Sequence, residues 1–388
     1  MLGKYLVRLK CKVFCFSLLS IAAAAETPRH PDNIADGWTF AVSGDSRNCG
    51  NVVMPAIASA VRSSGAAFYW HLGDYRAIYK FDEDYVVEPN IKRDGKDPTI
   101  SGYLSTAWDD FVSHQLSPFG DIPVYLAAGN HETIPPKTHD DYVKKFTDWF
   151  DKPELRTQRV KDNPMAVAPS SHYHWIKGSV DFINLDNSVR DTFDQAQLDW
   201  FVSIVLRDEV DSSIRTIVVG MHEALPDSVS AGHSMCGSSD GVVSGRFVYK
   251  ALVHAQEAAH KNVYVLASHS HFYLENAYNT AYWNDPKNGG AVLPGWIVGT
   301  AGAVRYKLPT GLPPGTDAKE HTYGYMTGTV AADGTIAFAF HPLDEDVLKR
   351  ARSADYTDDF VHTCFKDNPP VGDMSPDRSV DPCHENQP

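Results

Sequence analysis

Five short segments of the sequence each place side chains of metal-ligating types directly after an apolar run. Runs of this kind form buried strands. The segments read GDSR, GDYR, GNHE, MHE and SHSH, and in chain order they carry Asp45, Asp74, Asn130 with His131, His222, and His269 with His271. A single aspartate here is also explained by capping of a following helix, which for Asp45 would be a helix around residues 54–61. Five strand ends of one design favour a shared site.

The donor types of these segments indicate which ions such a site would bind. Carboxylate, amide and imidazole together suit Mn, Fe and Zn, whereas a set of oxygens alone would indicate Ca or Mg. A hydroxide that bridges two such ions is a nucleophile near neutral pH, and the two ions clamp both oxygens of an in-line displacement at phosphorus. Asp74 is the natural bridging carboxylate. We therefore expect metal-assisted hydrolysis at this site.

Short apolar strands alternate with amphipathic helices from residue 38 onward, which predicts an α/β fold. The predicted strands cover residues 39–42, 67–72, 124–127, 180–185, 216–219, 263–267 and 296–298. Helical spacing is found over residues 104–115, 140–150, 195–207 and 246–260. Two hairpins, with turns at 177–179 and 333–334, add antiparallel pairs. Ligands at the carboxyl ends of strands in such a fold converge on one crevice.

The ordered series of segments resembles the calcineurin-like metallophosphoesterases, over roughly residues 38–341. The run SHSHFYLE is similar to the Gly-His-x-His-x-Tyr-Glu-Arg segment of the purple acid phosphatase branch. The resemblance implies a four-layer α/β/β/α sandwich of two mixed sheets flanked by helices. It also implies hydrolysis of a small-molecule phosphate ester with two metal ions, among Fe, Mn and Zn.

The resemblance also assigns roles to individual side chains. It implies two ligand sets that share one carboxylate: Asp45, Asp74 and His271 for the first metal, and Asp74, Asn130, His222 and His269 for the second. His131 would be the general acid that protonates the leaving oxygen. Glu132 would orient its neighbours rather than bind a metal.

The sequence departs from the family pattern at the first metal. Members usually supply either a His two places after the first Asp or a Tyr three places after the second, and these places hold Arg47 and Ala77. Tyr75 or Tyr79 could complete that set instead. The Arg47 guanidinium stays protonated and cannot bind a metal, but its fork of donors matches two oxygens of a phosphate. We expect Arg47 to contact the substrate.

The first 25 residues predict a secretory signal peptide, with four basic residues, an apolar core over 13–21 and three alanines before Glu26. The apolar run is shorter than the roughly 20 residues that span a bilayer. Removal of this segment leaves 31 basic and 49 acidic residues, a formal net charge of −18. Such a charge argues against nucleic acid as a partner.

Four cysteines remain after this predicted cleavage, an even number that suits an oxidising compartment. The simplest pairing joins Cys49 to Cys236 and Cys364 to Cys383. We expect a secreted or periplasmic protein with a catalytic domain over residues 26–342. The polar residues 343–388 are predicted to pack on that domain as a tail.

Several interpretations of function and specificity stay open on the sequence alone. A phosphodiesterase or a nucleotidase would use the same centre, and an impaired first metal site would suit a non-catalytic pseudo-enzyme. Residues 80–102, 152–171 and 305–322 are predicted surface insertions that would set the substrate. His172 and His174 fit a polar strand face better than a metal site, and His233 is assigned to a loop.

Overall fold

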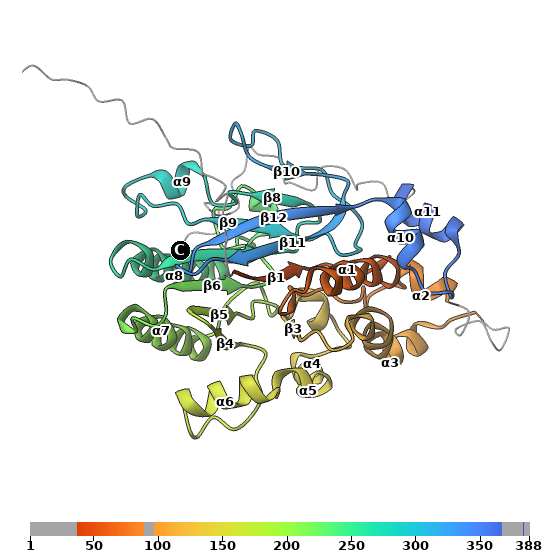
Figure 1. Cartoon of the computed structure of the whole chain (residues 1–388), viewed down its shortest axis with the longest axis horizontal. Coiled ribbons are helices and arrows are strands. Elements are labelled where there is room, and N and C mark those ends of the chain that lie inside the picture. Colours follow the sequence, from red (N-terminus) through yellow and green to blue (C-terminus); the bar gives the residue numbers. More distant parts are fainter. Residues whose placement is uncertain (1–36, 89–96, 367–382, 384–388) are drawn as a thin grey trace, which may run out of the picture. The chain divides into compact units, whose positions relative to one another are not determined.

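The computed structural model describes residues 37–88, 97–366 and 383, and the predicted signal peptide lies outside these residues. The described residues form one five-stranded and one seven-stranded sheet (Figure 1). Both sheets contain parallel and antiparallel pairs, as the alternation of strands with helices and hairpins predicts. The predicted α/β fold with two mixed sheets flanked by helices is confirmed.

The five-stranded sheet has the order β12-β11-β1-β2-β3. The neighbouring strands β1, β2 and β3 are parallel, whereas β11 runs antiparallel to both β1 and β12. The strands are β1 (Trp38–Ser43), β2 (Tyr69–His71), β3 (Val124–Leu126), β11 (Tyr323–Val330) and β12 (Ile336–Leu343). The carboxyl ends of β1, β2 and β3 therefore lie at the same edge.

The seven-stranded sheet has the order β10-β8-β9-β7-β6-β5-β4, with β5, β6, β7 and β9 parallel. The remaining strands pair antiparallel at its two sides. The strands are β4 (Tyr173–Lys177), β5 (Val180–Asn184), β6 (Thr216–Gly220), β7 (Asn262–Ala267), β8 (Tyr273–Glu275), β9 (Gly295–Val298) and β10 (Ala318–Lys319).

Aromatic side chains fill the space between the two sheets. The rings of Phe40 and Phe182 lie 5.1 Å apart between centroids, and those of Trp70 and Trp175 also lie 5.1 Å apart. All four are buried, and such pairs add to the free energy of burying their area. This shared core fixes one sheet against the other, so that strand ends from both sheets can form one site.

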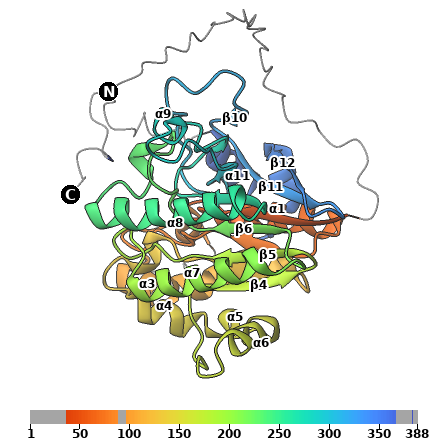
Figure 2. The ribbon, with the colours of Figure 1, turned by 90° about the vertical axis from the view of Figure 1, so that its left-hand side faces the viewer.

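Helices cover the outer faces of the sheets, with α1 along the five-stranded sheet and α7 and α8 along the seven-stranded sheet (Figures 1 and 2). The longer helices are α1 (Gly50–Ser64), α3 (Ile100–Asp110), α6 (Pro153–Asp162), α7 (Gln195–Val210), α8 (Ser239–Glu257) and α11 (Asp358–Lys366). The shorter ones are α2 (Glu83–Val87), α4 (His139–Lys145), α5 (Thr147–Phe150), α9 (Ala281–Asn284) and α10 (Glu345–Ala351).

Three helical segments differ from the sequence prediction, the first being α2, which lies in the predicted insertion 80–102. The expected helix over 140–150 is interrupted at Phe146, which separates α4 from α5. Residues 153–162, predicted as part of an irregular insertion, form α6, whose buried side chains are Leu155 and Gln158. With so little apolar surface on α6, the helical period is hidden in the sequence.

The two disulfides differ from the pairing that chain order suggests. Cys49 is bonded to Cys364 and Cys236 to Cys383, so the expected Cys49–Cys236 and Cys364–Cys383 pairs are wrong. The Cys49–Cys364 bridge joins residues 315 positions apart, because the chain returns after β12 to pack α10 against α1, and the Cys236–Cys383 bridge joins residues 147 positions apart. Sequence spacing carries no information on contacts of that kind.

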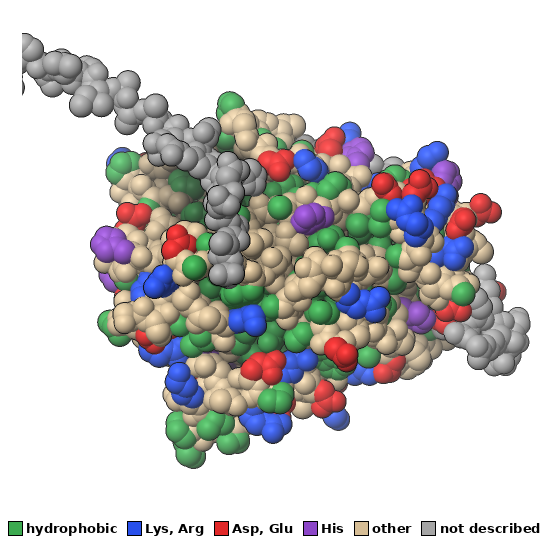
Figure 3. Space-filling model, in the orientation of Figure 1, with side chains coloured by type: hydrophobic (Ala, Val, Ile, Leu, Met, Phe, Trp, Pro, Cys, Tyr) green, Lys and Arg blue, Asp and Glu red, His purple; other side chains and the backbone are tan. Residues whose placement is uncertain are grey.

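No helix in the described part of the chain is long and apolar enough to cross a membrane. On the face shown in Figure 3, acidic and basic side chains are interspersed, including where α10 and α11 lie. The described residues on this face (Figure 3) therefore show no large patch of acidic side chains, although the net charge of the sequence is negative.

Candidate metal centre

Each predicted ligand lies just beyond the carboxyl end of a strand. Asp45 follows β1, and Asp74 follows the adjacent parallel strand β2. The two loops are joined, since the amide of Asp45 donates to the carbonyl of Gly73 and that of Ser46 donates to the carbonyl of Asp74, both at 2.9 Å. The other ligands follow β3, β6 and β7, and they are Asn130, His222, and His269 with His271.

The backbone is strained where it turns these side chains inward. Asp45, Asp74 and His269 have φ angles of 62°, 61° and 62°, in the left-handed region. Such a conformation costs on the order of 1–3 kcal/mol per residue and concentrates at functional sites. Two glycines make room for the carboxylates: a Cβ on Gly129 would collide with Asp74, and one on Gly299 would lie 2.8 Å from Asp45 Oδ2.

Four side chains form a compact donor set around the Nε2 atom of His222. This atom lies 3.1 Å from Asn130 Oδ1, 3.0 Å from His269 Nδ1 and 3.3 Å from Asp74 Oδ1. Ligand bonds of about 2.1 Å place neighbouring donors about 3.0–3.4 Å apart around one ion. Asp74, His222 and His269 form a group whose donor atoms all lie within 4.8 Å of one another. This set fits a single metal ion.

The tautomer of His222 also fits a metal ligand. Its Nδ1 atom donates to the carbonyl oxygen of Leu72 at 2.8 Å, a bond between the two sheets that leaves Nε2 facing the donor set. Burial opposes a charge on this imidazole, but the Asp74 carboxylate raises the pKa of His222 to about 10, so Nε2 holds a proton that a bound metal ion would displace. Burial raises the pKa of Asp74, but the nearby imidazoles of His131 and His222 outweigh this effect and hold the pKa well below its usual range.

Two buried carboxylate oxygens of the centre need a positive charge beside them. Asp45 Oδ1 and Asp74 Oδ2 are buried and have no hydrogen-bond partner among the described residues. Burial raises the pKa of Asp45, but His271 outweighs it and lowers the pKa to about 2, so this carboxylate is ionised at neutral pH. A buried ionised oxygen is costly unless a positive charge compensates it.

Asp45 and His271 lie together in the first predicted set. Asp45 Oδ1 is 3.2 Å from His271 Nε2, and Asp45 Oδ2 accepts a hydrogen bond from the backbone amide of His269 at 2.7 Å. Asp45 does not cap α1, because the residue at that helix start is Cys49 and no side-chain cap is formed there. The helix-capping alternative for Asp45 is therefore wrong.

Arg47 lies among these donors instead of pointing to the surface. Its side chain is only 10 % exposed, and its Nη2 group donates to His271 Nε2 at 3.0 Å. Its Nη1 group donates to His131 Nε2 at 2.5 Å, and its Nε atom is 3.6 Å from Asp74 Oδ2. Burial opposes its charge, but the carboxylates of Asp74 and Asp45 raise the pKa of Arg47, so the guanidinium stays protonated.

His131 is anchored through its other ring nitrogen. Nδ1 donates to the carbonyl oxygen of Ala77 at 2.7 Å, so that Nε2 faces Arg47 and lies 3.6 Å from Asp74 Oδ2. Burial, reinforced by Arg47, lowers the pKa of His131 to about 4 against the opposing effect of Asp74. The imidazole at rest is therefore neutral, with an accepting Nε2 atom.

Glu132 holds the loops that carry the ligands. Its carboxylate accepts hydrogen bonds from the backbone amides of Asp74, Tyr75 and Gly129, at 2.8, 3.0 and 2.8 Å. Burial and the nearby Asp74 raise the pKa of Glu132 to about 8, while these three amides act against that rise. Glu132 thus joins the loops after β2 and β3.

Neither tyrosine proposed to complete the first set occupies that position. Tyr75 is buried in the core, where its hydroxyl donates to the carbonyl of Ala127 at 2.6 Å and its ring stacks on Phe111. Tyr79 is 57 % exposed, with its ring centroid 5.4 Å from that of His131. The substitution by Tyr75 is wrong, because this side chain points away from the centre.

Sequence reasoning missed Tyr306, which stacks on His271 with ring centroids 4.0 Å apart. Its ring is also 5.3 Å from that of His233, which in turn lies 5.3 Å from His269. Burial raises the pKa of the Tyr306 hydroxyl. The nearby Asp45 carboxylate also raises it, whereas the Arg47 guanidinium lowers it. Tyr306 lies in a predicted insertion without a motif, and only the contact itself reveals it.

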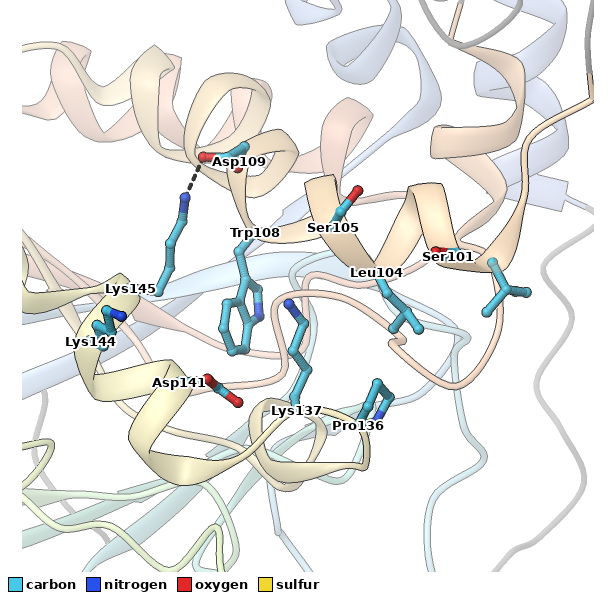
Figure 4. A pocket seen from close by; sticks show the side chains of 11 residues that line it. Ser101, Leu104, Ser105, Trp108, Asp109, Pro136, Lys137, Asp141, Lys144 and Lys145 are labelled. Carbon is cyan, nitrogen blue, oxygen red and sulfur yellow. Dashed lines mark hydrogen bonds and ion pairs between the residues drawn. The ribbon is translucent and has the colours of Figure 1, made fainter.

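Two other candidate regions lie outside the centre. His174 contacts Asp162 and Asp181 at 2.5 and 2.8 Å, which is an ion-pair cluster and agrees with the polar-face interpretation. A groove of about 840 Å³ between α3 and α4 contains three lysines, of which Lys145 pairs with Asp109 and Lys137 lies over the ring of Trp108 (Figure 4). None of the predicted ligands lines this groove.

The model of the calcineurin-like phosphoesterase family matches residues 49–273 of the chain. Among solved structures, a purple acid phosphatase from yellow lupin (Lupinus luteus) seeds is similar, with a TM-score of 0.50 and 16 % identity, covering 83 % of this chain and 56 % of that one. This chain therefore spans little more than half of that phosphatase, and at this identity the likeness is one of fold.

Two further solved structures are more distant. A dimetal phosphatase from Danio rerio has a TM-score of 0.45 and 12 % identity, covering 78 % of this chain and 98 % of that one. A structure of PhoD has a TM-score of 0.47 and 13 % identity, covering 87 % of this chain and 78 % of that one. No curated protein has a sequence that matches this chain. Since the family match extends over more than half of the chain, this protein belongs to the calcineurin-like phosphoesterases.

Proposed function

We propose that this protein is an exported, metal-dependent phosphoesterase that hydrolyses small-molecule phosphate monoesters. The observation that carries the proposal is the convergence of Asp74, Asn130, His222 and His269 beside two further groups that suit phosphate chemistry, Arg47 and His131. Two disulfides and the predicted signal peptide support export to an oxidising compartment.

The ion would be Mn, Fe or Zn, because the donors combine carboxylate, amide and imidazole. When bound, such an ion supplies a Lewis acid and a water that ionises near neutral pH. The two ions that the family resemblance implies stay a prediction for this chain, since the set around His222 and the set around Asp45 differ in composition.

Arg47 and His131 supply the remaining chemistry. Arg47 has five N–H donors, of which hydrogen bonds within the described residues engage two, so others remain to orient the oxygens of a phosphate. His131 would give the proton to the leaving oxygen from Nε2, which requires the Arg47 Nη1 group to leave that atom and turn to the phosphate. A phosphate bound beside it favours the protonated imidazole, because a nearby negative charge stabilises that form.

The proposal is tested with the full mature chain, p-nitrophenyl phosphate and bis(p-nitrophenyl) phosphate, before and after metal removal. We expect monoester hydrolysis that EDTA abolishes and Mn²⁺ or Zn²⁺ restores. His131→Ala should lower kcat by about 10²–10⁴-fold for an alkyl ester. The loss should be much smaller for the p-nitrophenyl ester, whose leaving group needs no acid.

Other outcomes would replace the proposal by one of its alternatives. Faster turnover of the diester would favour a phosphodiesterase with the same centre. A metal-loaded, folded protein that hydrolyses neither ester would contradict a catalytic role and favour a binding protein.

A further inference from the structure

The two halves of the centre differ in how their donor atoms are used. In the half around His222, the Nε2 atom faces an amide oxygen, a carboxylate oxygen and a second imidazole, which are all potential ligands. In the half around Asp45, the Nε2 atom of His271 faces one potential ligand, Asp45 Oδ1 at 3.2 Å, and a guanidinium N–H of Arg47 points at it from 3.0 Å.

The tautomer of His271 makes this contact decisive. Nδ1 donates to the carbonyl oxygen of Val304 at 2.5 Å, so a neutral imidazole has only one remaining lone pair, on Nε2. An arginine donates hydrogen bonds and never accepts them. The lone pair that would bind a first metal is therefore already paired with a cationic donor.

Three contacts hold Arg47 in this position. Besides His271, its guanidinium donates to His131 Nε2, and its Nε atom lies 3.6 Å from the Asp74 oxygen that has no hydrogen-bond partner among the described residues. The side chain is almost fully buried between these groups. A metal ion on the same lone pair would meet a fixed positive charge in a medium of low dielectric constant, where like charges repel strongly.

The residue types of the first set also argue against a metal ion there. The first set has neither a His at position 47 nor a Tyr at position 77, so it has fewer donors than the second set. The donors of the second set fit a metal ion, whereas those of the first set are arranged around an arginine.

We infer that Arg47 takes the place of the first metal ion, and that the centre binds one ion, in the set of Asp74, Asn130, His222 and His269. The buried charge of Asp74, whose Oδ2 atom lies 3.6 Å from Arg47 Nε, is then balanced by a permanent cation of the protein. This inference rests on the proposed function, because it concerns the same centre. Arg47 would orient the substrate phosphate in the manner in which a second ion does in a two-metal site.

The test is the number of Mn²⁺ ions bound per chain, measured by elemental analysis of the full mature protein after equilibration and gel filtration, without substrate. We expect one ion per chain and the electron paramagnetic resonance spectrum of isolated Mn²⁺. Arg47→His restores the ligand type that the family usually has at this place, and should raise the content to two ions with an exchange-coupled spectrum.

Arg47→Lys is the matched control, since it keeps a cation at the position and should still bind one ion. Two ions per chain in the wild type would overturn the inference, as would a folded Arg47→His variant that binds only one. If Arg47→His fails to fold, the wild-type content and spectrum decide.

The outcome separates this inference from the proposed function. Two ions with hydrolysis would refute the replacement by Arg47 and leave a phosphoesterase. One bound ion in a protein that hydrolyses neither ester would support the replacement of the first metal by Arg47 and refute the proposed phosphoesterase function. A wild type that binds no ion would overturn the inference, and hydrolysis in the presence of EDTA would then refute metal dependence.

Discussion

The half of the centre around His222 and the half around His271 share Asp74 and begin from the same local design. In both, a strand ends, the backbone turns through a left-handed residue, and an imidazole is fixed by a carbonyl oxygen that accepts from Nδ1. They differ in the groups that face Nε2, which are three further ligands in one half and the Asp45 carboxylate together with the Arg47 guanidinium in the other. A strand-end site of this kind can thus be completed either by an external ion or by a cation of the chain.

The largest expected difference comes from removing one imidazole from each half. His222→Ala deletes the donor at the middle of the metal set, so we expect loss of the bound ion and a fall in kcat/KM of at least about 10³-fold, since outer-shell changes alone cost about 10–100-fold. His271→Ala should keep the ion and lower kcat/KM by about 10- to 100-fold, by releasing Arg47.

Metal content and kinetics of these two variants, measured side by side, check this contrast. Equal loss of the ion from both variants would contradict the difference between the two halves, because it would mean that His271 binds the ion as His222 does.

A smaller effect is expected from Tyr306, whose ring stacks on His271. Tyr306→Phe keeps the stack and removes the hydroxyl, and one lost hydrogen bond to a phosphate costs about 1 kcal/mol, or about fivefold in KM. Tyr306→Ala also removes the stack and should weaken the position of Arg47 further. An unchanged KM in both variants would show that substrate binds away from the half with His271.

The smallest effect on activity is expected from His174, a histidine with two carboxylate partners that lies outside the centre. Burial lowers its pKa, but hydrogen bonds to Asp162 and Asp181 outweigh burial and raise it to about 9. The folded pKa exceeds the unfolded value of about 6.5, so this stabilisation is complete below pH 6.5 and is lost as the pH rises through 9.

The wild type should therefore lose up to about 3 kcal/mol of unfolding free energy between pH 6.5 and 9, relative to a His174→Gln variant. Urea unfolding at several pH values measures this difference, and Mn²⁺ binding serves as the control. A change in metal content on this substitution would contradict the distinction between an ion-pair cluster and a metal site.

Most strands, and the convergence of the ligands that follow them, could be predicted because apolar runs and the residues after them are local in sequence. The short strands β8 and β10 could not, since two or three residues carry too little pattern. The helix α6 could not, since only Leu155 and Gln158 of it are buried. The disulfide partners of Cys49 and Cys236 lie 315 and 147 residues away, where the chain folds back, and no local pattern encodes such a contact.

The position of Arg47 could be predicted only in part. Its type and place indicated a phosphate contact, but its hydrogen bonds to His131 and His271 depend on side chains that are 84 and 224 residues away in the chain. Tyr306 was hidden for the same reason, because it reaches His271 from a loop without a motif.

The most direct test of the central claim is the anomalous scattering of Mn²⁺ in crystals of the mature protein grown with an excess of this ion. We expect one peak, in contact with Asn130, His222 and His269, with the Arg47 guanidinium still against His271. Two peaks a few ångströms apart, with Arg47 displaced toward solvent, would contradict it.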